Sequence, residues 1–367
     1  MFSGSSFGKR IKVTIFGGSH EARIGVTMEG LPKGVKIDLR NIERMLERRR
    51  PGQNEFSTAR NEPDKPVIKS GLHNGVTFGP PLSVVIENTD VQKQAYQDFY
   101  DTPRPSHADY TGRLKYGSDV SLSGGGPFSG RMTAPLCVAG AIAAQILEGH
   151  RVCVGARVFS IGAVRDEAGD PARVTETELL EIRKKPFPVR SDAAGQKMRE
   201  EILSAKQDGD SVGGVVECCV LGFPPGIGGP LYDGVESALA PILFGIPAAK
   251  AVEFGAGFGS SLLRGSENND PFYAEKTETG DHVMKTRTNN HGGILGGVTS
   301  GMPIIARVAF KPTPSIAIEQ DTARISTGEN VKLTITGRHD PCVALRAVPV
   351  VESAMAIGLL DLLLARA

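Results

Sequence analysis

Three loops of the sequence place a histidine among glycine, arginine or hydroxyl side chains. Gly17-Gly-Ser-His20 follows one predicted strand, and Gly337-Arg-His-Asp340 follows another. Between them, Asp101-Thr-Pro-Arg-Pro-Ser-His107 has prolines that preclude a regular helix. An imidazole titrates near neutral pH, which suits general acid or base chemistry. A lone histidine is more often structural, but three such loops in one chain favour a catalytic site.

Arginine residues are the second feature of these loops. Arg104, Arg131 and Arg338 each lie beside a glycine or proline turn. Arg49 belongs to an arginine run that ends a predicted helix, where such a run is usually solvated. Guanidinium groups bind carboxylate and phosphate through two parallel hydrogen bonds. Net charge is only +1, from 42 Lys+Arg and 41 Asp+Glu, so the arginines indicate a small polyanionic substrate and no nucleic acid.

Glycine-rich polar backbone is the third ingredient. The chain has 45 glycines and 24 prolines. Together they make up about 19% of its residues, against roughly 12% in an average protein. The run Ser121–Arg131 leads into a predicted buried helix, where free N–H groups suit an anion, although a flexible hairpin fits equally well. Asn289–Gly297 and Lys311–Ser315 repeat the theme, and such backbone can lie against a flat cofactor and its phosphate.

Several common sites are missing from the sequence. It has no P-loop, no G-x-S-x-G motif and no H-E-x-x-H motif. Gly255-Ala-Gly257-Phe-Gly-Ser260 lacks the third glycine of a dinucleotide-binding motif. Five cysteines form no C-x-x-C pair, which predicts a reducing compartment and no metal site. The N-terminus lacks a signal-peptide core, and Glu352 and Asp361 interrupt the apolar C-terminal stretch, so we expect a cytoplasmic protein without a membrane span.

The predicted elements do not alternate regularly, which favours an α+β fold. Predicted strands cover 11–16, 82–87, 152–158, 212–220, 304–310 and 331–336. One helix is predicted from the cap Asp38 to Pro51 and another after the capping box of Thr175 and Glu178. Further predicted helices cover 134–149, 192–206 and 348–366. No linker divides the chain, so we expect one domain over residues 1–367.

Two parts of the sequence resemble each other faintly. Glycine-rich segments precede both the helix near 38–50 and a helix near 233–244. Arg131 and Pro135 precede one apolar helix in the way that Arg346 and Pro349 precede the C-terminal helix. The pattern indicates two structurally similar halves. Chance recurrence in a chain rich in glycine and proline is the alternative.

Taken together and in order, these segments resemble the chorismate synthase family over essentially the whole chain. The matching motifs are Phe16-Gly-Gly-Ser-His20, Arg48-Arg-Arg-Pro-Gly52, Arg104-Pro-Ser-His107-Ala-Asp-Tyr-Thr111 with Lys115-Tyr-Gly117, Gly124-Gly-Gly126 with Ser129 and Arg131, Asn290-His-Gly-Gly-Ile-Leu-Gly-Gly297, Lys311-Pro-Thr313, and Gly337-Arg-His-Asp-Pro-Cys342 with Arg346-Ala-Val-Pro349. Seven matches in register are a specific signal.

The resemblance implies a fold and a reaction. The family fold is a β-α-β sandwich, here expected as two similar halves, and the family assembles as a homotetramer. Its members eliminate phosphate from 5-enolpyruvylshikimate 3-phosphate to give chorismate in the shikimate pathway. This 1,4-anti elimination involves no net redox change but requires reduced FMN. NADPH is expected only as a possible source of electrons, and the chain shows no separate nicotinamide domain.

The resemblance also assigns roles to residues. His107 is expected to protonate the leaving phosphate, His20 to act on the reduced flavin, and Asp340 to assist proton removal through flavin N5. Arg49, Arg104 and Arg131 fall at positions associated with the anionic substrate or NADP. Residues at family flavin positions are Ser129, Ala248, Gly296, Lys311, Pro312, Thr313, Pro314, Ser315 and Arg338.

The sequence departs from the family pattern in three places. Gly18 and Glu21 flank Ser19-His20 where the family usually has Gly-Glu-Ser-His-Gly. Pro127 and Glu55 stand where many members have arginine. Charge around the flavin or the substrate phosphate is therefore expected to be arranged differently. The alternatives are a flavin enzyme of the same fold with another phosphorylated cyclic acid, and a regulator that binds ligand without turnover, which the intact His20, His107 and Asp340 disfavour.

Overall fold

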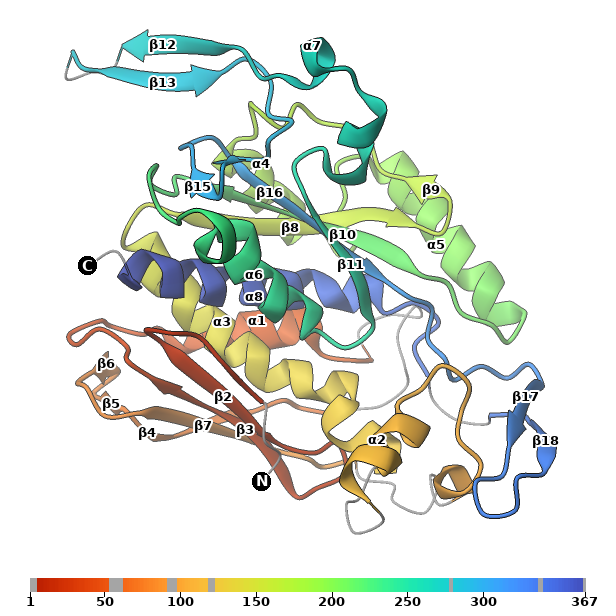
Figure 1. Ribbon diagram of the computed structural model, residues 1–367. Helices are drawn as coiled ribbons and strands as arrows, with labels where there is room; N and C mark the ends of the chain where they lie inside the picture. The colour runs from red at the N-terminus through yellow and green to blue at the C-terminus, as the bar shows by residue number, and fades with distance from the viewer. Residues whose placement is uncertain are drawn as a thin grey trace.

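The computed structural model describes residues 5–52, 62–90, 98–117, 123–276, 280–335 and 339–365. Two antiparallel five-stranded sheets enclose a layer of helices (Figure 1). The first sheet has the order β1-β2-β3-β7-β4, and the second has the order β11-β16-β10-β8-β9. The first comprises β1 (Ser6–Phe7), β2 (Lys12–Gly17), β3 (Arg23–Glu29), β4 (Pro66–Ser70) and β7 (Leu82–Glu87). The second comprises β8 (Cys153–Ile161), β9 (Val164–Arg165), β10 (Gly214–Leu221), β11 (Ala249–Phe254) and β16 (Ile304–Phe310).

The layer between the sheets consists of α1 (Leu39–Arg49), α3 (Thr133–Glu148), α6 (Val235–Phe244) and α8 (Ala344–Ala365). Outside it lie α2 (Asp109–Tyr116), α4 (Glu176–Lys184), α5 (Asp192–Gln207) and α7 (Gly265–Asn268). The described chain also contains four hairpins: β5 (Leu72–His73) with β6 (Val76–Thr77), β12 (Phe272–Lys276) with β13 (His282–Thr286), β14 (Ile294–Leu295) with β15 (Val298–Thr299), and β17 (Gln320–Ala323) with β18 (Asn330–Leu333). Short 3-10 helices cover Asp98–Tyr100, Ser123–Phe128, Gly130–Met132, Leu231–Asp233 and Gly257–Leu262. The α+β prediction is confirmed.

The central helices α3 and α8 are apolar on nearly all sides because both sheets and their neighbours cover them. The helical stretch Gly130–Glu148, which includes α3, and the helix α8 are each long and apolar enough to cross a membrane by composition, yet 83% of each apolar stretch is buried inside the protein. Glu352 of α8 accepts two hydrogen bonds from Arg48 of α1, at 2.6 and 2.9 Å, and one from the Ala156 N–H of β8. Asp361 accepts the N–H groups of residues 9–11, at the entry to β2. The two acidic residues therefore attach α8 to both sheets.

Both halves of the chain repeat one topology. The first runs β2, β3, α1, β4, β7, α3, and the second runs β8, β10, α6, β11, β16, α8. Across the sheets the corresponding orders are β2-β3-β7-β4 and β8-β10-β16-β11, with every neighbouring pair antiparallel. The helices that the sequence paired, α1 with α6 and α3 with α8, occupy corresponding positions. The prediction of two similar halves is confirmed.

Local sequence signals account for many boundaries. Asp38 caps α1 by accepting the Arg40 N–H, and Thr175 caps α4 by accepting the Glu178 N–H. Each of the six predicted strands has a counterpart, the one at 331–336 being β18 in a hairpin outside the two sheets. Among the strands that were not predicted are β3 and β4, which pair with β7 on its two sides.

The crossing of α3 and α8 provides a test of this core. A Cβ atom on Gly140 would lie 2.1 Å from the Cβ of Ser353, so α3 and α8 approach closely only because residue 140 is glycine. We predict that Gly140→Ala lowers the free energy of unfolding by about 1 to 3 kcal/mol, measured by denaturant titration.

Gly265→Ala is the matched control, because nothing lies within 4 Å of the added Cβ. Its effect should stay within about 0.5 kcal/mol. Equal stability of the two variants would contradict the close crossing.

Candidate active site

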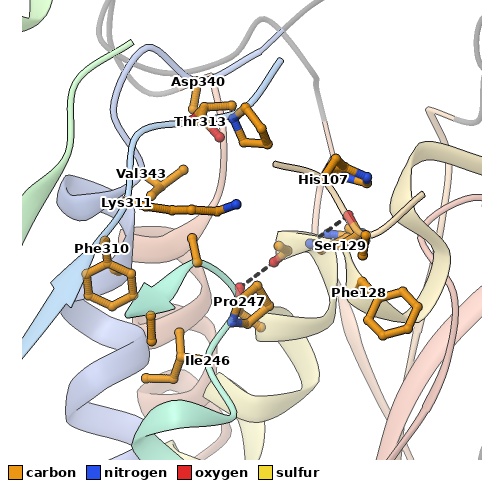
Figure 2. Close-up of a pocket in the computed structure, with 18 of the residues that line it drawn as sticks. His107, Phe128, Ser129, Ile246, Pro247, Phe310, Lys311, Thr313, Asp340 and Val343 are labelled. Atoms are coloured by element: carbon orange, nitrogen blue, oxygen red, sulfur yellow. Dashed lines mark hydrogen bonds between the residues drawn. The ribbon is translucent and has the colours of Figure 1, made fainter. Parts of the chain in front are cut away.

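A cavity of about 650 Å³ opens where corresponding ends of the two halves meet (Figure 2). Its walls come from the starts of α3 and α8, the ends of α1 and α6, and the segments that follow β7 and β16. Each half therefore contributes the same three kinds of element. A volume of this size suits one or two small ligands.

Most of the predicted site residues line this one cavity, although they come from distant parts of the sequence. They are His20, Arg49, Arg104, His107, Ser129, Arg131, Ala248, Lys311, Thr313, Pro314, Ser315 and Asp340. Pro312 lies between two lining residues but does not itself line the cavity. Arg338 and Glu55 lie outside the described residues. The roles given to all these residues stay predictions.

Gly296 does not line this cavity in the single chain, and its assignment to the flavin stays a prediction. It belongs to the β14–β15 hairpin, where Gly293 packs against Met302 and Pro303 just before β16 begins. Lys311 follows the other end of β16, and seven residues of strand span about 20 Å. The glycine-rich motif alone did not reveal at which end of β16 it lies.

His107 and Arg104 share one carboxylate. His107 Nδ1 lies 2.7 Å from Asp109 Oδ1, and Arg104 binds the same carboxylate through Nε at 2.7 Å and Nη2 at 2.8 Å. Burial opposes ionisation of Asp109, but its hydrogen bonds with Arg104 and His107 outweigh this and hold its pKa well below the usual range. Asp109 thus fixes the ring of His107 through Nδ1 and supplies a counter-charge to a protonated ring.

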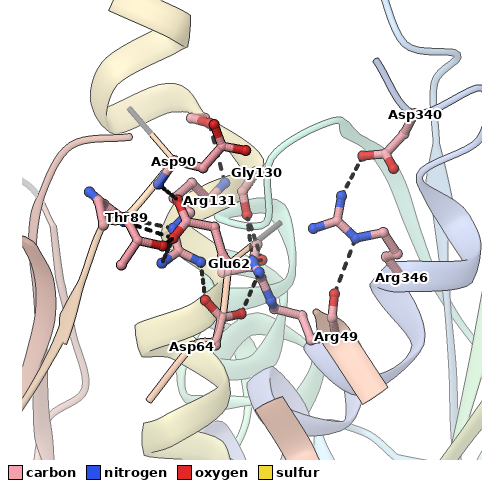
Figure 3. Close-up of polar contacts among 12 residues, drawn as sticks. Arg49, Glu62, Asp64, Thr89, Asp90, Gly130, Arg131, Asp340 and Arg346 are labelled. Carbon is pink, nitrogen blue, oxygen red and sulfur yellow. Dashed lines mark hydrogen bonds and ion pairs between the residues drawn. The ribbon is translucent and has the colours of Figure 1, made fainter. Parts of the chain in front are cut away.

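Arg49 and Arg131 are buried side by side at the other wall (Figure 3). Asp64 lies between them, 2.8 Å from Arg49 Nη2 and in direct contact with Arg131 Nη1. Burial opposes ionisation of Asp64, but the two guanidinium groups outweigh it and lower its pKa. Burial also lowers the pKa of Arg49 to about 10, against the attraction of Asp64. Asp64 therefore permits two like charges to be buried together.

Asp340 is held by a further arginine. Arg346 of α8 pairs with the Asp340 carboxylate and donates from Nε to the Arg49 backbone carbonyl at 3.1 Å (Figure 3). From the sequence, the loop that contains His339 was expected at a catalytic site, but no specific role was predicted for His339, Arg346, Asp109 or Asp64. Arg346 and Asp109 lie inside matched motifs, which could have revealed them. Asp64 carried no local signal, because its partners Arg49 and Arg131 lie 15 and 67 residues away in the sequence.

The triple-glycine run shapes the wall beside His20. Gly124, Gly125 and Gly126 all have positive φ, which disfavours other residues, and a Cβ on Gly124 would lie 2.2 Å from His20 Nε2. A Cβ on Gly125 would reach His107 at 3.4 Å. The run therefore brings bare backbone against both imidazoles. Of the departures from the family pattern, Pro127 lines the cavity and Gly18 lies against the Glu21 side chain.

The segment after β16 presents polar atoms suited to a cofactor. Lys311 Nζ donates to the Ser106 carbonyl, and burial together with Lys250 lowers its pKa. Thr313 Oγ1 is buried without a hydrogen-bond partner among the described residues. His339 Nε2 is also buried and has no hydrogen-bond partner in the part of the chain that the structure describes. Buried polar atoms of this kind are normally satisfied, so they indicate a place for a ligand.

The glycine run supplies a test of the His20 wall. We predict that Gly124→Ala displaces the His20 ring, because the added Cβ has no space, and lowers by at least about tenfold the affinity for the flavin that the sequence resemblance implies. Binding is measured by flavin absorbance titration.

Gly117→Ala is the matched control, since Gly117 also has a positive φ but nothing within 4 Å of an added Cβ. Its backbone, with φ 73° and ψ −168°, disfavours alanine at least as strongly as that of Gly124, with φ 60° and ψ 21°, so the control imposes strain without the clash. Similar flavin affinity in the two variants would contradict the assigned role of the glycine run.

The shared carboxylate supplies a second test. We predict that Asp64→Asn lowers the free energy of unfolding by about 3 to 5 kcal/mol, because two buried guanidinium groups lose their counter-charge. Chemical denaturation measures the change. Asp321→Asn, which breaks an exposed pair with Lys332, should leave stability unchanged within error, and a similar result for Asp64→Asn would refute the buried network.

Comparison with known proteins gives one consistent answer. The sequence model of the family described as chorismate synthase matches residues 11–364. Curated relatives named chorismate synthase include those of Pyrococcus abyssi, 45% identical over 98% of this chain and 97% of the relative, and Thermococcus kodakarensis, 44% identical with the same coverage. The relative from Methanosarcina barkeri is 40% identical over 98% of this chain and 96% of its own length.

A solved structure supports the same assignment. A crystal structure of chorismate synthase superposes with a TM-score of 0.77 and 26% identity, covering 98% of this chain and 93% of that one. Together with the sandwich of two similar halves and the matched motifs, these likenesses show the family. The chain belongs to the chorismate synthase family, whose enzymes are lyases that eliminate phosphate in the shikimate pathway.

Proposed function

We propose that the chain catalyses the 1,4-anti elimination of phosphate from 5-enolpyruvylshikimate 3-phosphate to give chorismate, with reduced FMN bound beside the substrate. The observation that carries this proposal is the positive charge of the cavity. Arg49, Arg104, Arg131, Lys311 and Arg346 line it, against the single lining carboxylate Asp340 among the described residues. The substrate bears two carboxylates and a phosphate, and such cations match it.

His107 is suited to the leaving phosphate. When the C–O bond breaks, the electron pair leaves with phosphate, and a proton from His107 neutralises the charge that develops there. The Nδ1 contact with Asp109 leaves Nε2 as the ring nitrogen that can hold this proton. Arg104, which shares Asp109 and donates to Ser315 Oγ at 3.2 Å, keeps a second positive charge close to the same place.

The elimination also removes a proton from carbon, so the proton gained by phosphate is balanced by one lost from the ring. Asp340 is the lining carboxylate suited to that removal. Its pairing with Arg346, which is itself attached to the backbone of Arg49, orients the carboxylate. Asp340 and His107 lie in different segments of the cavity wall, as separate sites for a leaving proton and a leaving phosphate require.

The residues present fit FMN. Ser129, Ala248, Lys311, Thr313, Pro314 and Ser315 offer a cation, hydroxyl groups and close backbone, and Thr313 Oγ1 is a buried polar atom with no partner in the described chain. Reduced FMN supplies an electron-rich ring that stabilises electron deficiency in the substrate. His20, 6% exposed and packed on Gly124, is placed to exchange a proton with a ligand that contacts the glycine run.

Partners and location follow from the same assignment. We propose that reduced FMN comes from outside, with NADPH only as a remote electron source, and that the protein acts on small molecules in the cytoplasm without nucleic acid or membrane. We also propose a homotetramer. Exposed apolar side chains on the surface support an assembly, with Leu231 82%, Tyr232 90% and Leu262 86% exposed.

An anaerobic assay tests the reaction. With the phosphorylated substrate and reduced FMN, we predict release of phosphate and formation of chorismate; with oxidised FMN and NADPH instead, we predict neither. His107→Ala should lower turnover by about 10²-fold or more, because the leaving phosphate loses its proton donor.

His150→Ala is the control for this variant, since His150 is exposed and does not line the cavity. Its turnover should match that of the unaltered chain. Absence of phosphate release from the unaltered chain refutes the proposed reaction, and near-normal turnover of His107→Ala removes His107 from it.

Sedimentation tests the assembly. We predict a particle with four times the mass of one chain, and Tyr232→Glu should shift it toward smaller species by burying a charge at an interface. A monomer at all concentrations would contradict the proposed assembly.

A further inference from the structure

Two imidazoles of the cavity have opposite surroundings. His107 has a carboxylate on Nδ1, at 2.7 Å from Asp109. His339 has no hydrogen bond or ion pair within the described chain, and its Nε2 is buried. Both line the same cavity. Pairs of titratable groups with contrasting surroundings are a sign of divided roles in proton chemistry.

Positive charge surrounds His339. Arg104 and His107 face it from the segment that precedes α2, while Lys311 and Arg346 line the cavity with it from the end of β16 and from α8. Asp340, the next residue, is the one lining carboxylate of the described chain, and it is already paired with Arg346. Burial, then the charge of Arg104, lowers the pKa of His339 to about 4, with Asp340 acting the other way. His339 is therefore a neutral ring at neutral pH.

A neutral ring has one nitrogen lone pair that can accept a hydrogen bond or a proton. The buried Nε2 of His339 lacks the hydrogen bond that such atoms normally make. This lowers the stability of the ligand-free chain, and a ligand that supplies the partner would remove the loss. Ligands with several negative charges would also reverse the local potential, since opposite charge favours the charged form of a group. The unpartnered Nε2 and the charge of the ligands therefore both favour protonation of His339 when an anionic ligand binds.

We propose that His339 is a further residue of the active site, which takes up a proton and forms an ion-paired hydrogen bond when the anionic ligands enter the cavity. The proton comes from solvent, and no covalent bond changes. His339 then offsets one negative charge of the bound ligands and stays neutral in the free chain, where five other cations already crowd the cavity. This inference rests on the proposed function, because the ligands of that reaction bring the negative charge.

Calorimetry tests the uptake directly. Oxidised FMN and then 5-enolpyruvylshikimate 3-phosphate are titrated into the chain at about pH 5.5, in two buffers with different ionisation enthalpies. The difference in heat gives the protons taken up. We predict that His339→Gln takes up fewer protons than the unaltered chain, by up to about one for each chain. His150→Gln, an exposed control, should match the unaltered chain.

The outcomes separate the two proposals. No binding heat for either ligand with the unaltered chain would refute the proposed function and this inference together. Binding heat with equal proton uptake in the unaltered chain and His339→Gln would overturn this inference alone. Lower proton uptake in His339→Gln, with normal uptake in His150→Gln, would support the inference.

Stability of the ligand-free chain provides a second measurement if His339→Gln binds no ligand. The pKa of His339 is 6.5 in the unfolded chain and about 4 in the folded chain. Between these values the unfolded state binds more protons, so the free energy of unfolding falls as pH falls from about 6.5 to about 4, and the loss persists below that. His339→Gln should show a shallower fall. Parallel curves for the two proteins would overturn the inference.

Discussion

Asp64 lies between two buried guanidinium groups, and the positive cavity depends on that contact. Arg49 is 1% exposed and Arg131 is 5% exposed, so neither charge is stabilised by bulk water. Burying one such charge alone is costly, and burying two side by side without a counter-charge is worse. One carboxylate shared by both, with Glu62 3.7 Å from Arg131, makes the arrangement possible. Arg49 Nε has no hydrogen-bond partner in the described chain, so it can bind a ligand.

The duplicated fold explains why such a network forms at this place. Each half repeats two strands, a helix, two strands and a helix, and the halves pack through α3 and α8. The ends of corresponding elements therefore meet at one end of the sandwich. Arg49 ends α1, the glycine run leads into α3, and Lys311 follows β16. The cavity is lined by residues of both halves, so it forms only when the two halves pack together.

Much of this could be predicted from sequence where the signal is local. The caps at Asp38 and Thr175, the apolar helices and the paired halves follow from patterns within short windows. The motif residues His20, His107 and Asp340 were found because their types and neighbours are distinctive. Asp64 was not, because its importance comes from partners in two helices that only the fold brings together. Gly296 shows a different limit, since its motif does not reveal that the β14–β15 hairpin lies at the opposite end of β16 from Lys311.

The central claim is that one cavity at the junction of the halves holds the flavin and the phosphorylated substrate together, with cations matched to the substrate anions. A crystal structure with oxidised FMN and 5-enolpyruvylshikimate 3-phosphate tests it most directly. The account predicts the flavin against Lys311–Ser315 and the glycine run, and the substrate anions on Arg49, Arg104 and Arg131 with phosphate near His107. Ligands bound outside the cavity, or arginines that make no contact with the substrate, would contradict it.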